Sequence, residues 1–389
     1  MKKLGKIIKK IFIVIFRILP LTRAVIFESH PDFSDNSFAL YQEFLRRGIQ
    51  RRYRLYWMKT FRGGEIPELP EGVTVFENEP RGLAETIHRT YVLNTSKYII
   101  DCNSFVYKRR KGQIRIHLGH GMPVKIDLNY SRKFGDCDQY LVLSAFWKEI
   151  YTKQILVPEQ KLCCLGYPRN DVLVNPPSCP VWKEAVAAYR RVIVWMPTYR
   201  QHRRHLEGAM ANEYPYGMPC IHDKEELEAF HRVLGEKNVL VLFRPHPVQE
   251  LSLFRDSGLT HIRIADDAYL GEFQMTLYEL LANSGGLITD YSSVYFDYLL
   301  TDQPVALTIG DREEYFRHFT PAFPNYKAYI KGFYIENAED LIRFIRDTAE
   351  GTDSGRTERM GAKEMFHSYV DGRSAERIVD MLEDEYGLQ

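Results

Sequence analysis

The chain has 389 residues, of which 45% are hydrophobic and 13% aromatic, so it is too long for one ordinary core, and two domains are expected. Its 52 Lys and Arg residues nearly balance 51 Asp and Glu residues, for a formal net charge of +1; this excludes a polycation built for nucleic acid, and the aromatic content excludes a disordered chain. Six cysteines with no CxxC pair indicate free thiols in a reducing compartment rather than a disulfide framework.

The first predicted element is a basic amphipathic helix within residues 1–20. At about 100° per residue, its lysines and Arg17 fall on one side, and most of its Ile, Phe and Val residues fall on the other. The apolar run Ile11–Phe16 is far shorter than the roughly 20 residues that span a bilayer, and no small-residue cleavage site follows it, so a secretory signal is not expected. We expect this helix to lie in an anionic membrane surface; the alternative is a helix packed on the protein's own body.

Short apolar strands then alternate with helices through residues 21–175, the predicted N-terminal domain. Strands are expected at Arg23–Ser29, Arg54–Lys59, Val73–Asn78, Lys97–Asn103, Ile114–Gly121 and Gln139–Ala145. Helices are expected after Asp35 or Asn36 as a cap, with Gly48 as a stop, and at Gly82–Thr95 and Ala145–Gln154. This alternation predicts a parallel sheet with helices on both faces.

A proline-rich stretch, Val174–Trp182, reads as a linker, after which the alternation restarts in the predicted C-terminal domain, residues 176–389. Strands are expected at Arg191–Pro197, Asn238–Pro247, His261–Asp266, Gly286–Asp290 and Pro304–Ile309. Helices are expected within Asp223–Gly235, near Thr276–Ala282, from Ser292, near Ala338–Thr348 and at Arg373–Glu385. The predicted fold class is α/β, with two Rossmann-like doubly wound domains facing a cleft.

Polar clusters follow the predicted strands, where ligands bind in such sheets. The clusters contain His120 and Lys125; Arg169, Asn170 and Asp171; Thr198, Tyr199 and Arg200; Arg244 and His246; and Asp290, Ser292 and Ser293. We expect them to gather in the cleft between the domains. The alternative for Arg169 and Arg200 is a surface ion pair, and the basic run Lys108–Gly112 reads as a solvated loop.

The sequence Thr289-Asp290-Tyr291-Ser292-Ser293 ends a strand and begins a helix. The first N–H groups of a helix lack intrahelical partners and bind phosphate well, so this turn is a candidate diphosphate site. The alternative is that Ser292 is only an N-cap.

Two histidines are candidate catalytic residues. His120 lies between two glycines, which let another group approach closely, and an imidazole near neutral pH can accept a proton from an attacking hydroxyl. His246 lies between two prolines and, with Arg244, is placed to meet a diphosphate oxygen or protonate a leaving group. The alternative for each is a structural histidine.

Five segments, HLGHGMPVK, GYPRNDVL, MPTYR, LFRPHP and LITDYSSVYFDYLL, together resemble the CDP-glycerol glycerophosphotransferase family, the primases and polymerases of teichoic acids and related polymers. The resemblance runs from about Phe27 to Pro304. The chain departs from the commonest family wording at HLGHGMP, where many members have Trp before the His-Gly pair and Thr after it, and at RPHP, where many have RxHP.

The resemblance implies a GT-B fold and a peripheral enzyme on the cytoplasmic face of the cell membrane. Matching the motifs residue by residue makes His120 the base that activates the acceptor hydroxyl and places His246 near the donor diphosphate. The matched motifs also assign Asp290, Ser292, Ser293 and Asn170 to donor binding. Three further donor-binding residues are expected because they follow predicted strands: Arg244, Arg200 and Thr198.

The expected reaction, of the EC 2.7.8 type, moves glycerol phosphate or another polyol phosphate from a CDP-polyol to a lipid-linked (polyprenyl-diphosphate) saccharide acceptor and releases CMP. We expect no tightly bound metal, no cofactor and no nucleic-acid partner. Two alternatives stay open: a GT-B glycosyltransferase that uses a nucleotide sugar, and a catalytically silent membrane-bound scaffold.

Overall fold

The computed structural model describes residues 2–60, 66–126, 135–198, 214–245, 254, 258–323 and 325–389. The chain forms two compact units. Unit 1 comprises Met1–Met122, Leu128–Asp171 and His367–Gln389, and unit 2 comprises Pro123–Asp127 and Val172–Phe366.

Unit 1 includes residues 1–20, and the chain passes into unit 2 after Asp171. Beyond this, the bounds differ in two larger ways from the domains expected at 21–175 and 176–389. The last 23 residues, His367–Gln389, return to unit 1, and the short segment Pro123–Asp127 belongs to unit 2. Both differences come from pairings between distant parts of the chain, which a local pattern does not reveal.

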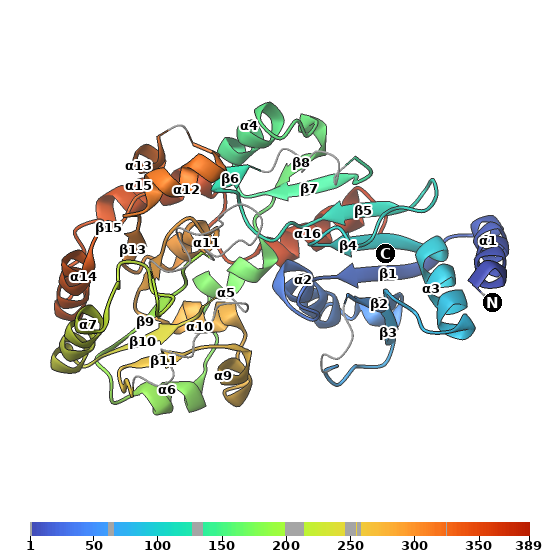
Figure 1. Ribbon diagram of the computed structural model, residues 1–389. Coiled ribbons are helices and arrows are strands. Elements are labelled where there is room, and N and C mark those ends of the chain that lie inside the picture. The colour runs from blue at the N-terminus through green and yellow to red at the C-terminus, as the bar shows by residue number, and fades with distance from the viewer. Residues whose placement is uncertain are drawn as a thin grey trace. The chain divides into compact units, whose positions relative to one another are not determined.

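In the described part of unit 1, seven parallel strands form one sheet (Figure 1). Their order is β3 (Val73–Glu77), β2 (Arg54–Lys59), β1 (Thr22–Glu28), β4 (Ser96–Asp101), β5 (Ile114–His117), β7 (Gln139–Val142) and β8 (Leu162–Cys164). Phe27 on β1 packs in the core against Phe44 and Trp57, with ring centroids 5.2 and 6.1 Å away. The strand order reverses between β1 and β4, which is the position where such sheets bind ligands.

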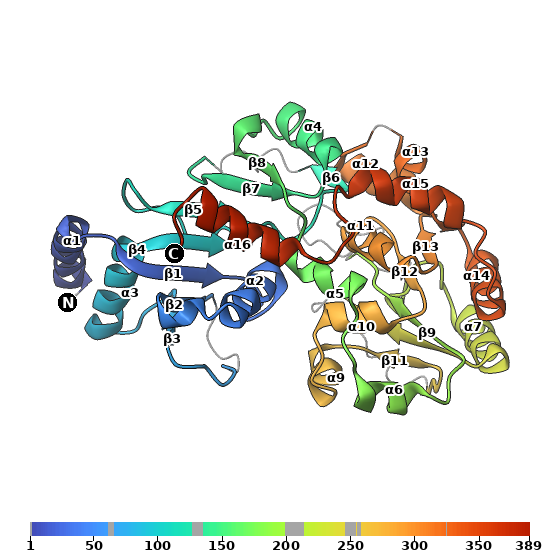
Figure 2. The ribbon, with the colours of Figure 1, turned by 180° about the vertical axis from the view of Figure 1, so that it is seen from behind.

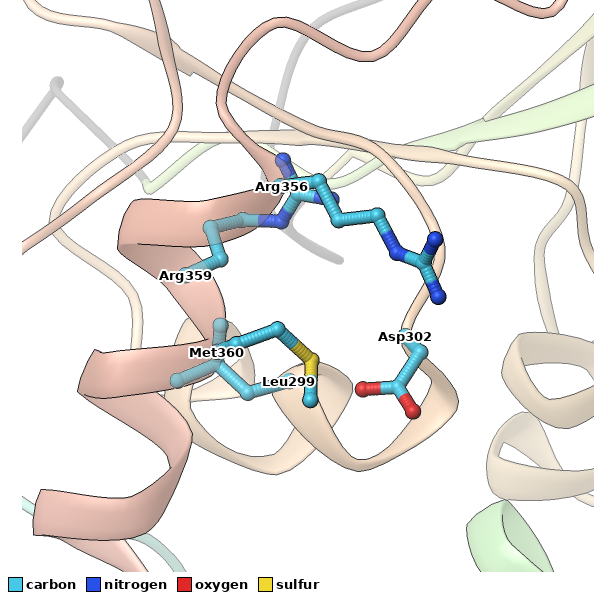
Figure 3. A pocket seen from close by; sticks show the side chains of 5 residues that line it. All are labelled: Leu299, Asp302, Arg356, Arg359 and Met360. Atoms are coloured by element: carbon cyan, nitrogen blue, oxygen red, sulfur yellow. The ribbon is translucent and has the colours of Figure 1, made fainter.

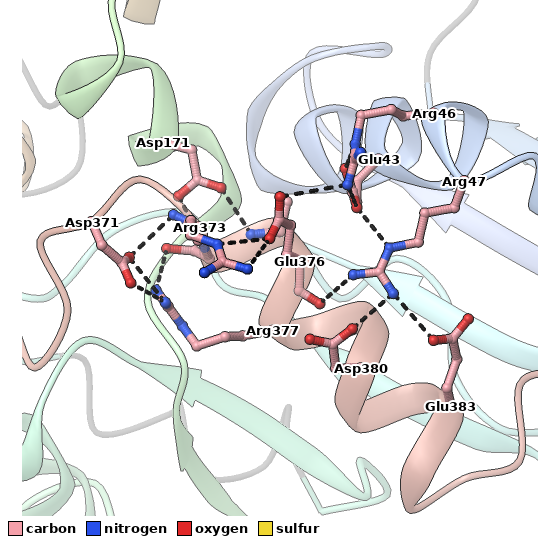
Figure 4. A network of polar contacts seen from close by, with 12 residues as sticks. Glu43, Arg46, Arg47, Asp171, Asp371, Arg373, Glu376, Arg377, Asp380 and Glu383 are labelled. Atoms are coloured by element: carbon pink, nitrogen blue, oxygen red, sulfur yellow. Dashed lines mark hydrogen bonds and ion pairs between the residues drawn. The ribbon is translucent and has the colours of Figure 1, made fainter.

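The helices of unit 1 include α2 (Asp35–Arg46), α3 (Leu83–Thr95), α4 (Ala145–Lys153), α16 (Ser374–Asp384) and the short turns η1 (Ile49–Arg51), η3 (Glu159–Lys161) and η4 (Pro168–Asn170). Helix α2 begins after Ser34, which is its N-cap, so neither Asp35 nor Asn36 is the cap that the sequence suggested. Helix α16 packs along α2, where Arg47 reaches Asp380 at 2.7 Å and Glu383 at 3.1 Å (Figure 4). This pairing places the end of the chain in unit 1.

Helix α1 (Lys2–Ile18) lies beside α3 in both ribbon views (Figures 1 and 2). The ring of Phe16 contacts Tyr91 of α3 edge-on, with centroids 5.4 Å apart. Ile11, Val14, Ile15 and Ile18 remain 45–78% exposed. Among the described residues, no helix is both long and apolar enough to cross a bilayer.

Unit 2 is built on a second parallel sheet, which in the described residues has the order β11 (Ile262–Ile264), β10 (Val239–Phe243), β9 (Arg191–Trp195), β12 (Leu287–Thr289), β13 (Val305–Thr308) and β15 (Phe333–Ile335). The order reverses between β9 and β12. Trp195 packs edge-on against Phe230 and Phe243 in the core of this unit. A separate two-stranded ribbon pairs β6 (Lys125–Ile126) with β14 (Thr320–Pro321), which places Lys125 in unit 2.

Helix α5 (Asp171–Val174) carries the chain from unit 1 into unit 2. The helices of unit 2 include α6 (Pro180–Val186), α7 (Lys224–Lys237), α9 (Asp267–Glu272), α10 (Leu277–Asn283), α11 (Val294–Tyr298), α12 (Arg312–His318), α13 (Tyr326–Tyr329), α14 (Ala338–Glu350), α15 (Arg356–Phe366) and the short turn η5 (Leu299–Thr301). Each predicted strand and helix overlaps an observed one. The predicted linker, Val174–Trp182, is not free of regular structure, because α6 begins within it at Pro180. The structure also contains elements that the sequence did not predict, among them β8, β15, α12 and α15.

Candidate active site

The Gly119–Gly121 turn follows β5 and carries His120 at its tip. Gly119 has φ +69° and Gly121 has φ +147°, values that residues with a Cβ rarely adopt. A Cβ at Gly119 would also lie 3.0 Å from the hydroxyl of Tyr167. The two glycines therefore shape the turn, and they leave the His120 side chain exposed.

The ring of His120 is oriented by the end of the neighbouring strand β4. Its Nδ1 lies 3.3 Å from the backbone oxygen of Cys102. A carbonyl oxygen accepts a hydrogen bond, so this contact favours the tautomer that carries the proton on Nδ1 and leaves a lone pair on Nε2. Surrounding protein lowers the pKa of His120, partly opposed by the carboxylate of Asp35. A neutral imidazole with a free Nε2 lone pair is suited to accept a proton.

Two side chains from elsewhere in unit 1 hold the backbone of this turn. The amide of Asn36 donates to the oxygen of Gly119 at 3.0 Å, and the guanidinium of Arg169 donates to the oxygen of His120 at 3.0 Å. Asp35 forms an ion pair with Arg169 at 2.7 Å. The sequence did not assign Asp35 or Asn36 to the site, and it left Arg169 between a ligand contact and a surface ion pair. The structure shows an ion pair, but Arg169 is only 7% exposed.

A buried ionic network lies at the same ends of β4 and β5. The carboxylate of Asp101 contacts the guanidinium of Arg115 and Nδ1 of His117, each at 2.8 Å, and all three residues are at most 2% exposed. Burial alone would raise the pKa of Asp101, but His117 and Arg115 hold it at about 2. Next to it, burial and the charge of Asp101 raise the pKa of Glu28 to about 8. This network fixes the strand ends that carry His120.

Asn170 and Asp171 belong to the segment that leaves unit 1. Asn170 ends η4 and is only 3% exposed. The carboxylate of Asp171 accepts hydrogen bonds at 2.8 Å from the backbone N–H groups of Ser374 and Ala375, at the start of α16 (Figure 4). Asp171 therefore satisfies two N–H groups at the N-terminus of α16, which is a structural use of its carboxylate.

In unit 2, Thr198 and Asp290 meet where the strand order reverses between β9 and β12. The backbone N–H of Thr198 lies 2.9 Å from both carboxylate oxygens of Asp290, and the N–H of Tyr291 lies 2.6 Å from one of them. Asp290 is fully buried. Its carboxylate thus joins the loops after the two strands.

Ser292 and Ser293 follow at the start of α11 and are half-buried. Ser293 is the N-cap, and its side chain makes no capping hydrogen bond. The Oγ of Ser292 is 3.5 Å from the backbone nitrogen of Val294, which is longer than a usual N–H···O hydrogen bond. The simple alternative, in which Ser292 is the N-cap, is therefore not what the structure has.

Two cationic side chains of unit 2 have defined partners. Arg244, directly after β10, donates to the backbone oxygen of Ala265 at 2.7 Å and to Asp267 at 2.6 Å. Lys125 donates to the hydroxyl of Tyr315 at 2.9 Å. Burial lowers the pKa of Lys125, and the charge of Asp290 opposes that shift.

Three predicted site residues, Tyr199, Arg200 and His246, lie outside the described residues. In the described ranges, no group of three His, Cys, Asp or Glu side chains is placed to hold a metal ion. A small pocket in unit 2, beside η5 and α15, is lined by Leu299, Asp302, Arg356, Arg359 and Met360 (Figure 3). None of the predicted site residues lines it.

Comparison with known proteins places these features in a family context. Residues 11–384 match the family described as CDP-Glycerol:Poly(glycerophosphate) glycerophosphotransferase. The chain is 26% identical over 302 residues to a teichoic acid ribitol-phosphate primase of Bacillus spizizenii, covering 72% of this chain and 71% of the primase. It is 23% identical over 381 residues to the teichoic acid ribitol-phosphate polymerase TarL of Staphylococcus aureus, covering 90% of this chain but 60% of that polymerase.

Among solved structures, the wall teichoic acid polymerase TagF superposes with a TM-score of 0.74 at 18% identity, covering 97% of this chain and 93% of that one. At this identity the likeness concerns the fold. It confirms the predicted α/β fold of the GT-B type, with two Rossmann-like units.

Proposed function

Because the chain belongs to the CDP-glycerol:poly(glycerophosphate) glycerophosphotransferase family, we propose that it transfers glycerol phosphate or a related polyol phosphate from a CDP-linked donor in teichoic-acid or related surface-polymer synthesis. The acceptor in this proposal is a hydroxyl group of a lipid-linked saccharide, and the leaving group is CMP. The observation that supports it most directly is His120, exposed on a glycine-flanked turn with its Nε2 free of the Cys102 contact.

In the proposed reaction, the acceptor oxygen attacks the β-phosphorus of the CDP-polyol. A new P–O bond forms to the acceptor, the bond from the β-phosphorus to the bridging oxygen breaks, and CMP carries that oxygen away. The acceptor proton passes to Nε2 of His120. Phosphoryl transfer relies mainly on positioning and on stabilising charge on the phosphate oxygens, so the protein needs a base on one side and hydrogen-bond donors on the other.

We assign the donor side of the reaction chiefly to unit 2. Ser292 and Ser293 offer hydroxyl and N–H groups at the start of α11, and the buried Asp290–Thr198 pair fixes the loops beside them. Arg244 is held at the end of β10 by Asp267. His246 and Arg200 complete the proposed set on the basis of their sequence motifs, and Asn170 contributes from unit 1.

The identity of the polyol is the finer question. The family description names glycerophosphate, whereas the primase and the polymerase compared above are named for ribitol phosphate. We therefore propose a CDP-polyol as the donor class and make the polyol an outcome of the experiment.

The test incubates the purified protein with CDP-glycerol, CDP-ribitol and UDP-sugars, each with a polyprenyl-diphosphate saccharide acceptor, followed by mass analysis of the lipid product. The proposal predicts CMP together with an acceptor that is heavier by one or more polyol phosphates, and loss of both with His120→Ala. Release of UDP with transfer of a sugar would support a glycosyltransferase instead. Unchanged cellular function of the His120→Ala and His246→Ala variants would support a scaffold.

We also propose that α1 holds the enzyme on the cytoplasmic face of an anionic membrane. One apolar face of α1 packs towards α3 through Phe16, while Ile11, Val14, Ile15 and Ile18 form an exposed stripe at helical spacing. The basic loop after β4 adjoins the same helix, because Arg110 donates to the backbone oxygen of Leu19 at 2.6 Å. An exposed apolar stripe beside Lys and Arg residues suits a surface of anionic lipids.

A flotation assay tests this location. The full chain should bind vesicles that contain phosphatidylglycerol and should leave them at high salt or without anionic lipid. A chain that lacks residues 1–19 should stay in solution. Equal binding of the truncated chain to anionic vesicles would exclude α1 as the anchor.

A further inference from the structure

Asn36 and Arg169 fix the carbonyl groups on both sides of the His120 α-carbon. The carbonyl of Gly119 accepts from the Asn36 amide, and the carbonyl of His120 accepts from the Arg169 guanidinium, each at 3.0 Å. The two supports are themselves linked, since the backbone N–H of Arg169 donates to Oδ1 of Asn36 at 3.1 Å. Asn36 is fully buried and Arg169 nearly so. The turn is therefore restrained at two successive peptide groups.

Asp35 completes this arrangement from the first turn of α2. One of its carboxylate oxygens accepts from the Arg169 guanidinium at 2.7 Å and from the backbone N–H of Asn36 at 2.6 Å. Asp35 also has φ +60°, a left-handed conformation that costs a residue with a Cβ about 1 kcal/mol or more. A conformation of that kind persists only where surrounding contacts hold it. Here those contacts lead directly to the His120 turn.

We propose that Asp35, Asn36 and Arg169 are positioning residues that hold the His120 ring with Nδ1 on the Cys102 carbonyl oxygen and thereby present Nε2 to the acceptor hydroxyl. The inference rests on the proposed role of His120 as the base. The three residues act through His120. Metal-binding histidines in other proteins are held in a similar way, by hydrogen-bond partners that fix the tautomer and the direction of the ring.

The charges around His120 give this arrangement a measurable consequence. Desolvation by the surrounding protein atoms lowers the pKa of His120 most, His117 and Arg169 lower it further, and Asp35 and the Cys102 carbonyl raise it. When the base takes up a proton, the imidazolium that forms is stabilised by Asp35. Exchanging Asp35 for a neutral residue should lower the pKa of His120, and exchanging Arg169 for a neutral residue should raise it.

Asp35→Asn is the informative variant, because Asn also tolerates the left-handed conformation and keeps an oxygen for the Asn36 N–H. We expect the acid limb of the kcat/KM profile to move to lower pH in Asp35→Asn and to higher pH in Arg169→Gln. Asn36→Ala should lower kcat about 10- to 100-fold with little change in KM for the CDP-polyol, because misplacement of a base by about 1 Å has effects of that size. Asp384→Asn, an exposed residue near the end of α16, is the matched control and should leave the profile unchanged.

A second readout does not depend on turnover. The ring of His120 is titrated by NMR in protein labelled with ¹³C-histidine, with its signal assigned from the His120→Ala variant. Opposite shifts of the His120 pKa in Asp35→Asn and Arg169→Gln support the positioning role, whereas shifts of the same sign, or none, overturn it. If these shifts occur but no CDP-polyol is consumed by the wild-type protein, the proposed function fails and the positioning of His120 stands. If the wild-type protein consumes a CDP-polyol but the two variants do not show these pKa shifts, the positioning inference fails and the proposed function stands.

Discussion

Replacement of Asp290 by Asn should lower the local stability of unit 2 around β9 and β12. The buried carboxylate accepts hydrogen bonds from the N–H groups of Thr198 and Tyr291 and from the hydroxyl of Thr198. A hydrogen bond to a charged group contributes about 1.5–3 kcal/mol and one between neutral groups about 0.5–1.5 kcal/mol. Making three such bonds neutral therefore costs about 3 kcal/mol, and the new amide N–H₂ group faces the Thr198 N–H, which is also a donor.

The assay is hydrogen exchange followed by mass spectrometry, which reports each unit separately. A loss of about 3 kcal/mol corresponds to roughly 150-fold faster exchange for amides that open with the unit. We expect this acceleration in peptides that cover β9 and β12, and no change in β4 of unit 1. Asp302→Asn is the control, because Asp302 is an aspartate of unit 2 whose side chain is exposed and pairs with Lys363. If Asp290→Asn exchanges no faster than this control, the proposed loop-joining role of the carboxylate is wrong.

Three further changes test other parts of the structure. Glu28 keeps its proton in the folded state up to about pH 8 but loses it near pH 4.5 when unfolded, so wild-type stability should fall as pH rises between these values. Glu28→Gln should therefore be more stable than the wild type by on the order of 5 kcal/mol at pH 9 but not at pH 4; equal urea midpoints of the two proteins at pH 9 would contradict the raised pKa. Asp171→Ala should cost about 1–2 kcal/mol by removing the acceptor from the N-terminus of α16, seen as faster exchange in residues 374–384; unaltered exchange there would argue against this capping role. The double variant Val14→Asp with Ile18→Asp should lose binding to anionic vesicles while its far-UV circular dichroism stays that of the wild type, and retained binding would exclude the exposed stripe as the lipid contact.

The two sheets could be predicted because their strands are short, buried and apolar, with helices between them. Arg54–Lys59 was predicted to the residue, since the short apolar run Leu55–Met58 has a basic residue at each end. The return of α16 to unit 1 could not be predicted. It depends on Arg47 meeting Asp380 and Glu383, a pairing between helices more than 300 residues apart that leaves no local pattern.

Only those parts of the candidate site that leave a local sequence signal could be predicted. His120 was identified by its flanking glycines, because the turn that carries it needs glycine on both sides of the histidine. Asp35 and Asn36 were interpreted as helix caps, which is the common use of these residue types before an apolar periodic segment, and their contacts with Arg169 lie more than 130 residues away. Asp101 carried a weak signal, since it is a charged residue at the end of the apolar strand Lys97–Asn103, but its partner Arg115 comes from the next strand of the sheet.

The most direct measurement of the proposed phosphoryl transfer follows the β-phosphate of the donor. CDP-glycerol and CDP-ribitol, each labelled with ³²P at the phosphate next to the polyol, are incubated with the wild-type protein or the His120→Ala variant and the lipid-linked acceptor. We expect that, for one of these donors, the label moves into the lipid fraction, that unlabelled CMP is released, and that both events require His120. Release of labelled CDP, or label that enters the lipid equally well without His120, would contradict it.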